Sequence, residues 1–313
     1  MTVLVTGCAG FIGGHLCEAL LQRGDSVIGI DALTDNYDVQ VKQRNLSAYL
    51  ENPQFEYING NITDIDLRPI LEKVDCVFHT AGQPGVRASW GDCFELYLQN
   101  NIAAMQKILE CIKNLNKPIR VVFSSSSSIY GNTDQLPVTE LSLPQPFSPY
   151  GTTKLAAEHL CHLYHQNFNV PIVALRYFTV YGPRQRPDMG FHIFIKAMMQ
   201  NREISILGDG SQTRDFTFVE DIVQANLLAS QKPVEGQIFN IGGGSRRSLM
   251  DTINILEDVS GIKPKLVFKP AEKGDVKDTW ADTSKAKDQL GFEPKVDLEE
   301  GLKRQWLWEK EIY

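Results

Sequence analysis

Short apolar runs rich in β-branched residues alternate with amphipathic stretches up to residue 178, and this rhythm constrains the fold more than any other feature. The amphipathic stretches, at 12–22, about 96–113 and 151–168, have the spacing of helices that pack one face on a sheet. Runs with little polar alternation suit strands that are covered on both faces. The apolar runs lie at 3–6, 26–30, 55–59, 76–81, 120–125 and 172–177. The sequence therefore predicts an α/β fold with a doubly wound parallel sheet.

The rhythm loosens after residue 178, where a segment rich in Pro, Gly and Arg (YGPRQRPDMG) begins. We expect residues 1–178 to form the first domain and residues 179–313 to form a smaller α/β domain that holds the ligand. This second domain should be partly interleaved with the first, with returns of the chain near 215–245. Two domains without a flexible linker usually frame a cleft.

Composition and charge exclude some classes of partner. The formal net charge of −7 argues against a nucleic-acid-binding face. None of the six cysteines belongs to a C-x-x-C pair, which favours reduced thiols in a cytoplasmic protein. The chain opens on an apolar run without a basic leader, and no apolar run approaches the length of a membrane span. We therefore expect a cytoplasmic protein that binds neither nucleic acid nor a membrane.

A glycine-rich segment, TGCAGFIGG, joins the first predicted strand to the first predicted helix. Gly7, Gly10 and Gly13 have the spacing G-x-x-G-x-x-G. Glycine permits a tight turn and close approach of a pyrophosphate to the backbone. The helix start, with Phe11 and Ile12, offers free N–H groups to phosphate oxygens. The segment therefore indicates a dinucleotide site on a Rossmann-type sheet.

Asp31 ends the second predicted strand, at the distance from the glycines where a carboxylate can bind the 2′-hydroxyl of an adenosine ribose. A 2′-phosphate would be repelled by this carboxylate. The next three residues, Ala32, Leu33 and Thr34, supply no compensating cation. The pattern favours NAD over NADP, and a solvated aspartate at a strand end is the alternative interpretation.

The segment FSPYGTTK places Tyr150 one helical turn before Lys154. An ammonium beside a phenol favours the phenolate and lowers the pKa of the phenol, which makes Tyr150 a candidate general base. Ser148 and Pro149 suit the N-cap and the first position of a helix. The run FSSSSSIYG ends the preceding strand, where a serine could bind a sugar hydroxyl. Each pattern alone also has a bland interpretation, as a chance pair on a helix or as a polar loop.

Together these segments resemble the extended short-chain dehydrogenase/reductase family. The matching residues are TGCAGFIGG, Asp31, FSSSSSIYG and SPYGTTK, followed by RYFTVYGPRQRPDM, GDGSQTRDFTFVED, FNIGG and DTWADTSKAKDQLGFEP. The later segments are marks of its nucleotide-sugar epimerase, dehydratase and decarboxylase branch. The resemblance implies a catalytic set of Ser126, Tyr150 and Lys154, with NAD as the cofactor, a UDP-sugar as the substrate and a homodimer as the assembly. It implies further cofactor contacts from Asn61, Ile62, Ala81, Asn101, Tyr150, Lys154 and Tyr177.

The two residues after Ser126 discriminate among the reactions of this branch. The dehydratases have Asp-Glu at these positions, and the nucleotide-uronate decarboxylases have Glu at the second. This chain has Ser127 and Ser128 instead. The resemblance therefore implies 4-epimerisation, in which C4 is oxidised to a ketone, the sugar rotates and hydride returns to its other face. Decarboxylation of UDP-glucuronate is a less favoured alternative.

The identity of the sugar depends on the segments GPRQRPDMGFH and QPGVRASWG, which resemble those of UDP-glucuronate 4-epimerases. A C5 carboxylate needs a cation, and Arg offers a planar bidentate donor. Arg186 is the first candidate and Arg87 a weaker one, while Thr179, Ser127 and Ser128 would add hydroxyl donors. A surface charge or a pyrophosphate contact is the alternative role for Arg186. The resemblance further implies that Arg214 and Asp275 contact the UDP moiety.

Two rival functions stay open at this point. UDP-glucose 4-epimerases commonly have Asn where this chain has Thr179, which speaks against that activity without excluding it. A catalytically silent NAD-binding protein would be free to lose the Ser126, Tyr150 and Lys154 set. The three histidines on the Tyr150 helix lack partner acids with metal-ligand spacing, so we expect no metal site.

Overall fold

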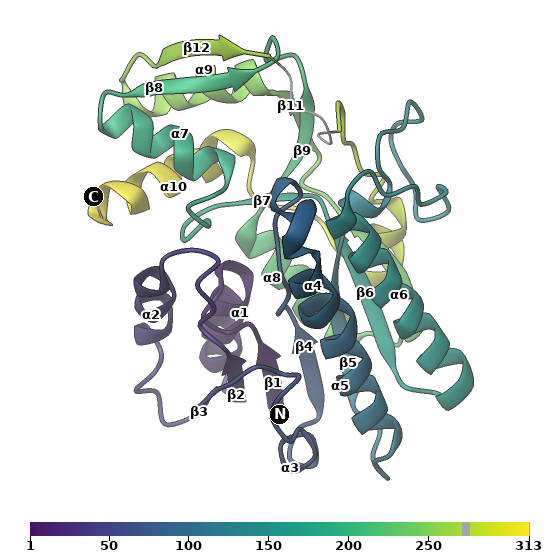
Figure 1. Ribbon diagram of the computed structural model, residues 1–313. Helices are drawn as coiled ribbons and strands as arrows, with labels where there is room; N and C mark the ends of the chain where they lie inside the picture. The colour runs from purple at the N-terminus through teal and green to yellow at the C-terminus, as the bar shows by residue number, and fades with distance from the viewer. Residues whose placement is uncertain (271–275, 313) are drawn as a thin grey trace.

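The computed structural model describes residues 1–270 and 276–312. In this part of the chain the main layer is a sheet of seven strands in the order β10-β6-β5-β4-β1-β2-β3 (Figure 1). The strands are β1 (Thr2–Thr6), β2 (Ser26–Asp31), β3 (Phe55–Asn59), β4 (Cys76–His79), β5 (Arg120–Ser126), β6 (Ile172–Tyr177) and β10 (Ile238–Ile241). All neighbours in this sheet run parallel, which confirms the predicted doubly wound, Rossmann-type α/β fold.

Helices cover both faces of this sheet. Val122 points toward the cluster that contains α1 (Phe11–Gln22) and α8 (Val219–Gln231), whereas Val121 points toward α5 (Ala104–Lys113) and α6 (Pro149–Phe168). Successive side chains of a strand point to opposite faces, so two cores form, one on each side. The remaining helices of this layer are α2 (Val39–Ser47), α3 (Arg68–Leu71) and α4 (Phe94–Tyr97), with helical turns at Arg87–Ser89, Gly91–Cys93, Leu98–Ala103 and Ser127–Ile129.

Two small sheets lie beyond the carboxyl ends of the main strands, at the top of Figure 1. One has the order β11-β9-β7 and the other pairs β12 with β8. Their strands are β7 (Thr179–Tyr181), β8 (Glu203–Leu207), β9 (Thr213–Phe218), β11 (Ser245–Ser248) and β12 (Lys265–Lys269). Their helices are α7 (Gly190–Met199), α9 (Leu249–Ser260) and α10 (Leu298–Ile312), and a further turn covers Ala286–Leu290.

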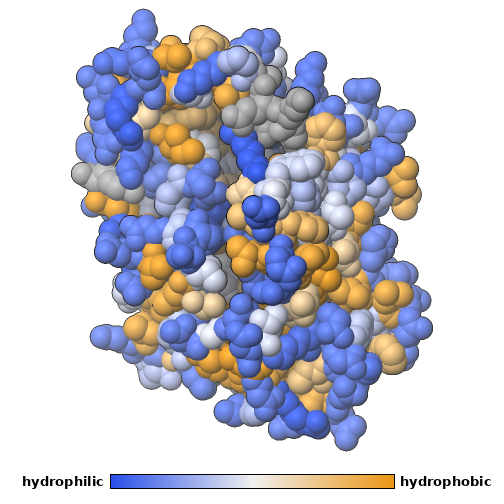
Figure 2. Space-filling view, viewed as in Figure 1, coloured by the Kyte–Doolittle hydropathy of each residue, from blue (hydrophilic) through white to orange (hydrophobic). Residues whose placement is uncertain are grey.

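Between β9 and β11, which belong to the same small sheet, the chain returns to the main layer. After β9 it forms α8, which packs on the main sheet, and then β10, which pairs with β6 at the edge of that sheet. The domain boundary at residue 178 remains a prediction; it falls immediately before β7. Figure 2 shows a mostly hydrophilic surface on the same face of the molecule, with apolar residues in small groups. In the described residues, no helix has both the length and the apolar character that crossing a membrane requires.

Candidate active site

The glycine-rich turn between β1 and α1 is closed so tightly that side chains are excluded from it. Gly7 has φ +73°, and a Cβ atom there would lie 2.9 Å from the backbone of Ala81. A Cβ atom on Gly13 would lie 2.1 Å from the carbonyl oxygen of Gly7. The N-cap residue Gly10 has no side chain to cap the helix, so the first N–H groups of α1 face the adjacent pocket.

This pocket contains most of the predicted cofactor contacts. The members of that set that line it are Gly7, Gly10, Phe11, Ile12, Gly13, Asp31, Asn61, Ile62 and Ala81. Asn101 and Lys154 lie directly behind the lining residue Gly82, where a Cβ atom would meet Asn101 Oδ1 at 2.8 Å and Lys154 Nζ at 3.3 Å. Asn101 also donates to Thr153 Oγ1 at 2.9 Å, which ties this edge of the pocket to α6.

Tyr177 is placed differently from the other predicted cofactor residues. Its buried hydroxyl hydrogen-bonds Ser124 Oγ at 3.1 Å and accepts a hydrogen bond from Asn226 Nδ2 of α8 at 2.7 Å. These partners lie on the face of the sheet opposite α6, so the hydroxyl points away from Tyr150. The structure therefore gives no support for a cofactor contact through this side chain.

Asp31 combines burial with two backbone donors. Oδ2 accepts a hydrogen bond from Ala9 N at 3.0 Å, and Oδ1 accepts one from Leu33 N at 2.8 Å. Burial raises the pKa of the carboxyl group, while these N–H donors and the charge of Lys42 act in the opposite direction. Each oxygen keeps a lone pair for a ribose hydroxyl in the pocket.

Lys42 is a cation near Asp31 that sequence reasoning missed. It lies on α2, is 5% exposed and lines the same pocket. Its Nζ donates to Thr34 O at 2.5 Å and to Asn36 Oδ1 at 2.6 Å, so it ties down the loop that follows β2. The three residues after Asp31 include no cation, but the fold brings Lys42, eleven positions after Asp31, to the same pocket.

The catalytic helix begins as the sequence predicts. Ser148 caps α6 by accepting a hydrogen bond from Gly151 N at 3.2 Å, and Pro149 occupies the first helical position. Tyr150 lies in the first turn, close enough to Ser126 at the end of β5 for that side chain to lower the pKa of the phenol. The side chain of Lys154 is buried, and its Nζ donates to the carbonyl oxygen of Ser124 at 2.9 Å. The structure thus brings the three predicted catalytic residues to one place.

The pKa of Tyr150 differs in direction from the sequence-based expectation. Burial raises it, while the side chain of Ser126 and the charge of Arg186 act to lower it, and burial prevails. Burial also lowers the pKa of Lys154 to about 8. Burial of the phenol therefore sets the direction of its pKa in this structure, and the role of Lys154 in lowering that pKa stays a prediction.

Arg186 reaches this region from the loop between β7 and α7. Its side chain is 21% exposed, lines the pocket and is close enough for its charge to lower the pKa of Tyr150 and of Tyr97. Its guanidinium forms a two-pronged ion pair with Asp188, with both N–O distances at 2.9 Å. This internal carboxylate partner was not predicted from the sequence.

The other predicted sugar contacts occupy the ends of nearby elements. Ser127 and Ser128 form the turn after β5, and Thr179 opens β7; all three side chains are half-buried. Arg87 begins a short helical turn and is exposed. Their roles in holding a sugar remain predictions.

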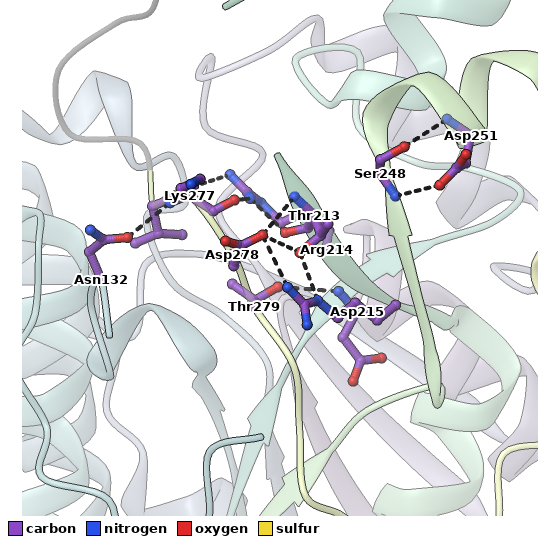
Figure 3. Close-up of polar contacts among 11 residues, drawn as sticks. Asn132, Thr213, Arg214, Asp215, Ser248, Asp251, Lys277, Asp278 and Thr279 are labelled. Carbon is purple, nitrogen blue, oxygen red and sulfur yellow. Dashed lines mark hydrogen bonds and ion pairs between the residues drawn. The ribbon is translucent and has the colours of Figure 1, made fainter. Parts of the chain in front are cut away.

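Figure 3 shows how β9, in the sheet β11-β9-β7, contacts the segment that follows residue 275. Arg214 on β9 donates to the carbonyl oxygens of Val276 at 2.7 Å and Lys277 at 2.9 Å. On the other side, Lys277 N donates to Asn132 Oδ1 at 3.0 Å. Asp275, the predicted ribose contact, lies outside the described residues. Arg214 is therefore positioned to fix the segment that leaves Asp275, and its predicted contact with UDP is not tested by these bonds.

A second arginine in this region was not anticipated. Arg246 on β11 donates from Nε to Thr213 Oγ1 at 2.8 Å and forms an ion pair with Asp278 at 3.3 Å. Asp278 also accepts a hydrogen bond from the backbone of Thr213 at 3.2 Å. The signal was weak in the sequence because S-R-R-S shows neither the position of this arginine on a strand nor its distance from Asp278.

Comparison with known proteins identifies the family. The family model described as GDP-mannose 4,6 dehydratase matches residues 4–305. An uncharacterized UDP-glucose epimerase of Bacillus subtilis, YtcB, is 45% identical over 100% of this chain and 99% of that protein. A UDP-glucuronate 4-epimerase of Thermodesulfobacterium geofontis is 42% identical, covering 98% of this chain and 96% of its own length.

A solved structure agrees with these relatives. The UDP-glucuronic acid 4-epimerase of Bacillus cereus, in complex with UDP-glucuronic acid and NAD, superposes with a TM-score of 0.97 at 44% identity. Each chain is covered over its whole length. The resemblance drawn from the sequence motifs is thereby confirmed. The chain belongs to the GDP-mannose 4,6 dehydratase family of extended short-chain dehydrogenases/reductases.

Proposed function

We propose that this protein is an NAD-dependent UDP-glucuronate 4-epimerase, which interconverts UDP-glucuronate and UDP-galacturonate. One observation of the structure carries the choice of substrate. A guanidinium, that of Arg186, lines the pocket beside the glycine-rich turn and acts electrostatically on Tyr150. A cation so close to the candidate base suits a substrate whose carboxylate lies next to the carbon that reacts. The Bacillus cereus structure, with UDP-glucuronic acid and NAD bound, supports this choice.

The residues of the pocket fit a dinucleotide. Gly13 lets the turn close against Gly7 O, and the open start of α1 offers N–H donors to a pyrophosphate. Asp31 would hold the adenosine ribose, with Asn61 and Ile62 near the base. NAD supplies the hydride acceptor for C4 oxidation and the donor for its reversal, so no net redox change results.

The chain's own residues handle the proton at O4. Tyr150 would take this proton as C4 is oxidised and return it on reduction. Ser126, which lies close enough to Tyr150 to lower the pKa of the phenol, would align O4. Lys154, fixed by Ser124 O, would place a positive charge beneath the site and contact the nicotinamide ribose.

The carboxylate needs restraint as well as binding. Once C4 is a ketone, glucuronate is a β-keto acid, which loses CO₂ when the C5–carboxylate bond aligns with the carbonyl π system. Arg186, Thr179, Ser127 and Ser128 would hold the carboxylate out of this alignment. The serines replace the acid that a proton-relaying decarboxylase would use at this turn.

Incubation with UDP-glucuronate and identification of the product by NMR test the proposal. UDP-galacturonate is the expected product. UDP-xylose as the main product would mean a decarboxylase, and no turnover would mean a silent NAD-binding protein. Tyr150→Phe is expected to abolish turnover while nucleotide binding persists, which would exclude the silent alternative.

UDP-glucose 4-epimerisation is the second candidate, because the Bacillus subtilis relative has that description. A neutral hexose would leave Arg186 without a substrate partner. Relative kcat/KM values for UDP-glucuronate and UDP-glucose decide between the two. A preference for UDP-glucose would overturn the proposal.

We also infer a cytoplasmic homodimer. The apolar side chains of Leu163 and Phe168 on α6 are 52% and 51% exposed, and Leu96 of the preceding α4 is 48% exposed. Pairing of this helical surface with a second copy would cover these side chains. Light scattering of the purified protein should give about twice the chain mass of 35.1 kDa, and a monomer would contradict the inference.

A further inference from the structure

Asp188 meets Arg186 along one defined edge of the guanidinium. Arg186 Nε donates to Asp188 Oδ1 and Arg186 Nη2 donates to Asp188 Oδ2, each at 2.9 Å. This is the side-on arrangement, in which the carboxylate covers the edge formed by Nε and Nη2. The guanidinium has five N–H donors, and this pair uses two of them. The end-on edge, formed by Nη1 and the second proton of Nη2, is not used by Asp188.

Buried hydrogen bonds also fix the backbone next to Arg186. The preceding side chain, Gln185, is 3% exposed. Its Oε1 accepts hydrogen bonds from His192 N and Gln305 Nε2, each at 3.0 Å, and its Nε2 donates to Val180 O at 3.1 Å. These partners belong to α7, α10 and β7, so three elements fix the loop. Both ends of the Arg186 side chain are therefore defined before a substrate arrives.

We propose that Asp188 is a specificity-determining positioning residue, which holds Arg186 side-on so that its end-on edge receives the substrate carboxylate. The inference rests on the proposed function. It assigns the two edges of one guanidinium to two carboxylates, one internal and one from the sugar. A free arginine loses rotamer freedom when it grips an anion, whereas an arginine already fixed by Asp188 loses less. A neutral sugar has no carboxylate to pair with the end-on edge, so this positioning should raise the affinity for uronates alone.

An opposite role for Asp188 makes a different prediction. If Asp188 occupied the site of the substrate carboxylate, the two would compete, and its removal would strengthen uronate binding. Removal of a negative charge near the pocket would also strengthen the binding of a uronate. The sign of the change therefore separates a positioning residue from a competitor.

The test compares wild type with Asp188→Asn, which keeps the shape of the side chain but removes its charge and one acceptor. We expect the dissociation constant of UDP-glucuronate for the NAD-loaded protein, measured by calorimetry, to rise about tenfold. The dissociation constant of UDP-glucose should change less than twofold. KM for UDP-glucuronate should rise by a similar factor, with a smaller change in kcat. Unchanged or tighter uronate binding, or equal losses for both sugars, would overturn the proposal.

Two controls keep the result specific. In an Arg186→Ala background, Asp188→Asn should cause no further loss of uronate binding, because Asp188 acts through that arginine; an equal further loss would refute this route. Asp209→Asn removes an exposed aspartate that bonds only Ser211 among the described residues, and should leave both constants unchanged. A wild-type protein that prefers UDP-glucose would refute the proposed function itself, whatever the variant does.

Discussion

Ser125 donates a hydrogen bond of 2.8 Å from Oγ to Glu158 Oε2, and this bond joins the strand that carries Ser126 to the helix that carries Tyr150. Glu158 lies one turn beyond Lys154 on α6 and is buried. Its carboxylate also pairs with Arg176 Nη2 at 2.5 Å. A buried carboxylate with such partners is costly to disturb, so the network fixes α6 against β5.

Loss of the Ser125 hydroxyl should therefore alter the catalytic phenol without unfolding the protein. In Ser125→Ala, the weaker hold on β5 should shift the neighbouring Ser126 side chain, which acts to lower the pKa of Tyr150. We expect kcat to fall several-fold and the acidic limb of the pH–kcat profile to move to higher pH, because the phenolate forms later. Ser125→Thr should restore both.

The matched control for this variant is Thr252→Ala on α9. Thr252 is fully buried, and its hydroxyl donates to Leu249 O at 2.7 Å. It lies on α9, far from Tyr150 in the sequence. The substitution should lower the melting temperature by a similar amount without moving the pH profile. An unmoved profile in Ser125→Ala would show that its hydroxyl serves stability alone.

Adjacent glycines give a matched pair for the dinucleotide site. In Gly13→Ala, the new Cβ atom would lie 2.1 Å from Gly7 O, so the turn must distort and NAD binding should weaken at least a hundredfold. In Gly14→Ala, the nearest atoms lie at 3.5 Å, an ordinary contact, and NAD binding should persist. Calorimetric titration with NAD measures both. Equal affinities in the two variants would refute the assignment of this turn to the pyrophosphate.

The parts of the site that the sequence predicted depend on local spacing. Gly7, Gly13, Tyr150 and Lys154 lie within short segments whose backbone geometry follows from residue type, as the Ser148 cap shows. The parallel sheet followed from apolar periodicity. These features need no knowledge of how distant segments meet.

The parts that the sequence did not predict depend on contacts across the fold or on side-chain geometry. Lys42 approaches Asp31 only because α2 folds back to the loop that follows β2, and Glu158 meets Arg176 only because α6 covers β6. The pairing of Arg186 with Asp188 is local, but a spacing of two residues in a loop does not determine which edge of a guanidinium is used. The direction of the pKa of Tyr150 was misjudged because the burial of the phenol is a property of the packed fold.

His79 at the end of β4 should make stability depend on pH. Burial lowers the pKa of its imidazole from 6.5 to about 3, and the nearby charge of Lys154 acts in the same direction. Between these values the unfolded chain binds a proton that the folded chain does not, so stability falls as pH drops, by up to about 1.4 kcal/mol per pH unit. Urea unfolding from pH 4 to 6.5 should show a shallower slope for His79→Gln. Parallel curves for the two proteins would contradict the expectation.

Arg186→Ala tests the restraint on the carboxylate directly. Without the guanidinium, the ring of the 4-keto intermediate can adopt a conformation in which the bond from C5 to the carboxylate aligns with the carbonyl π system. The electron pair of that bond then passes to the ketone as CO₂ leaves, C5 takes a proton, and return of hydride to C4 gives a UDP-pentose. NMR of the products from UDP-glucuronate should therefore show weaker overall turnover and a pentose signal that grows at the expense of UDP-galacturonate.

Arg186→Lys keeps the charge but not the planar fork, and it should give an intermediate pentose fraction. Wild-type binding together with a wild-type product ratio in Arg186→Ala would mean that the hydroxyls of Ser127, Ser128 and Thr179 hold the carboxylate without it.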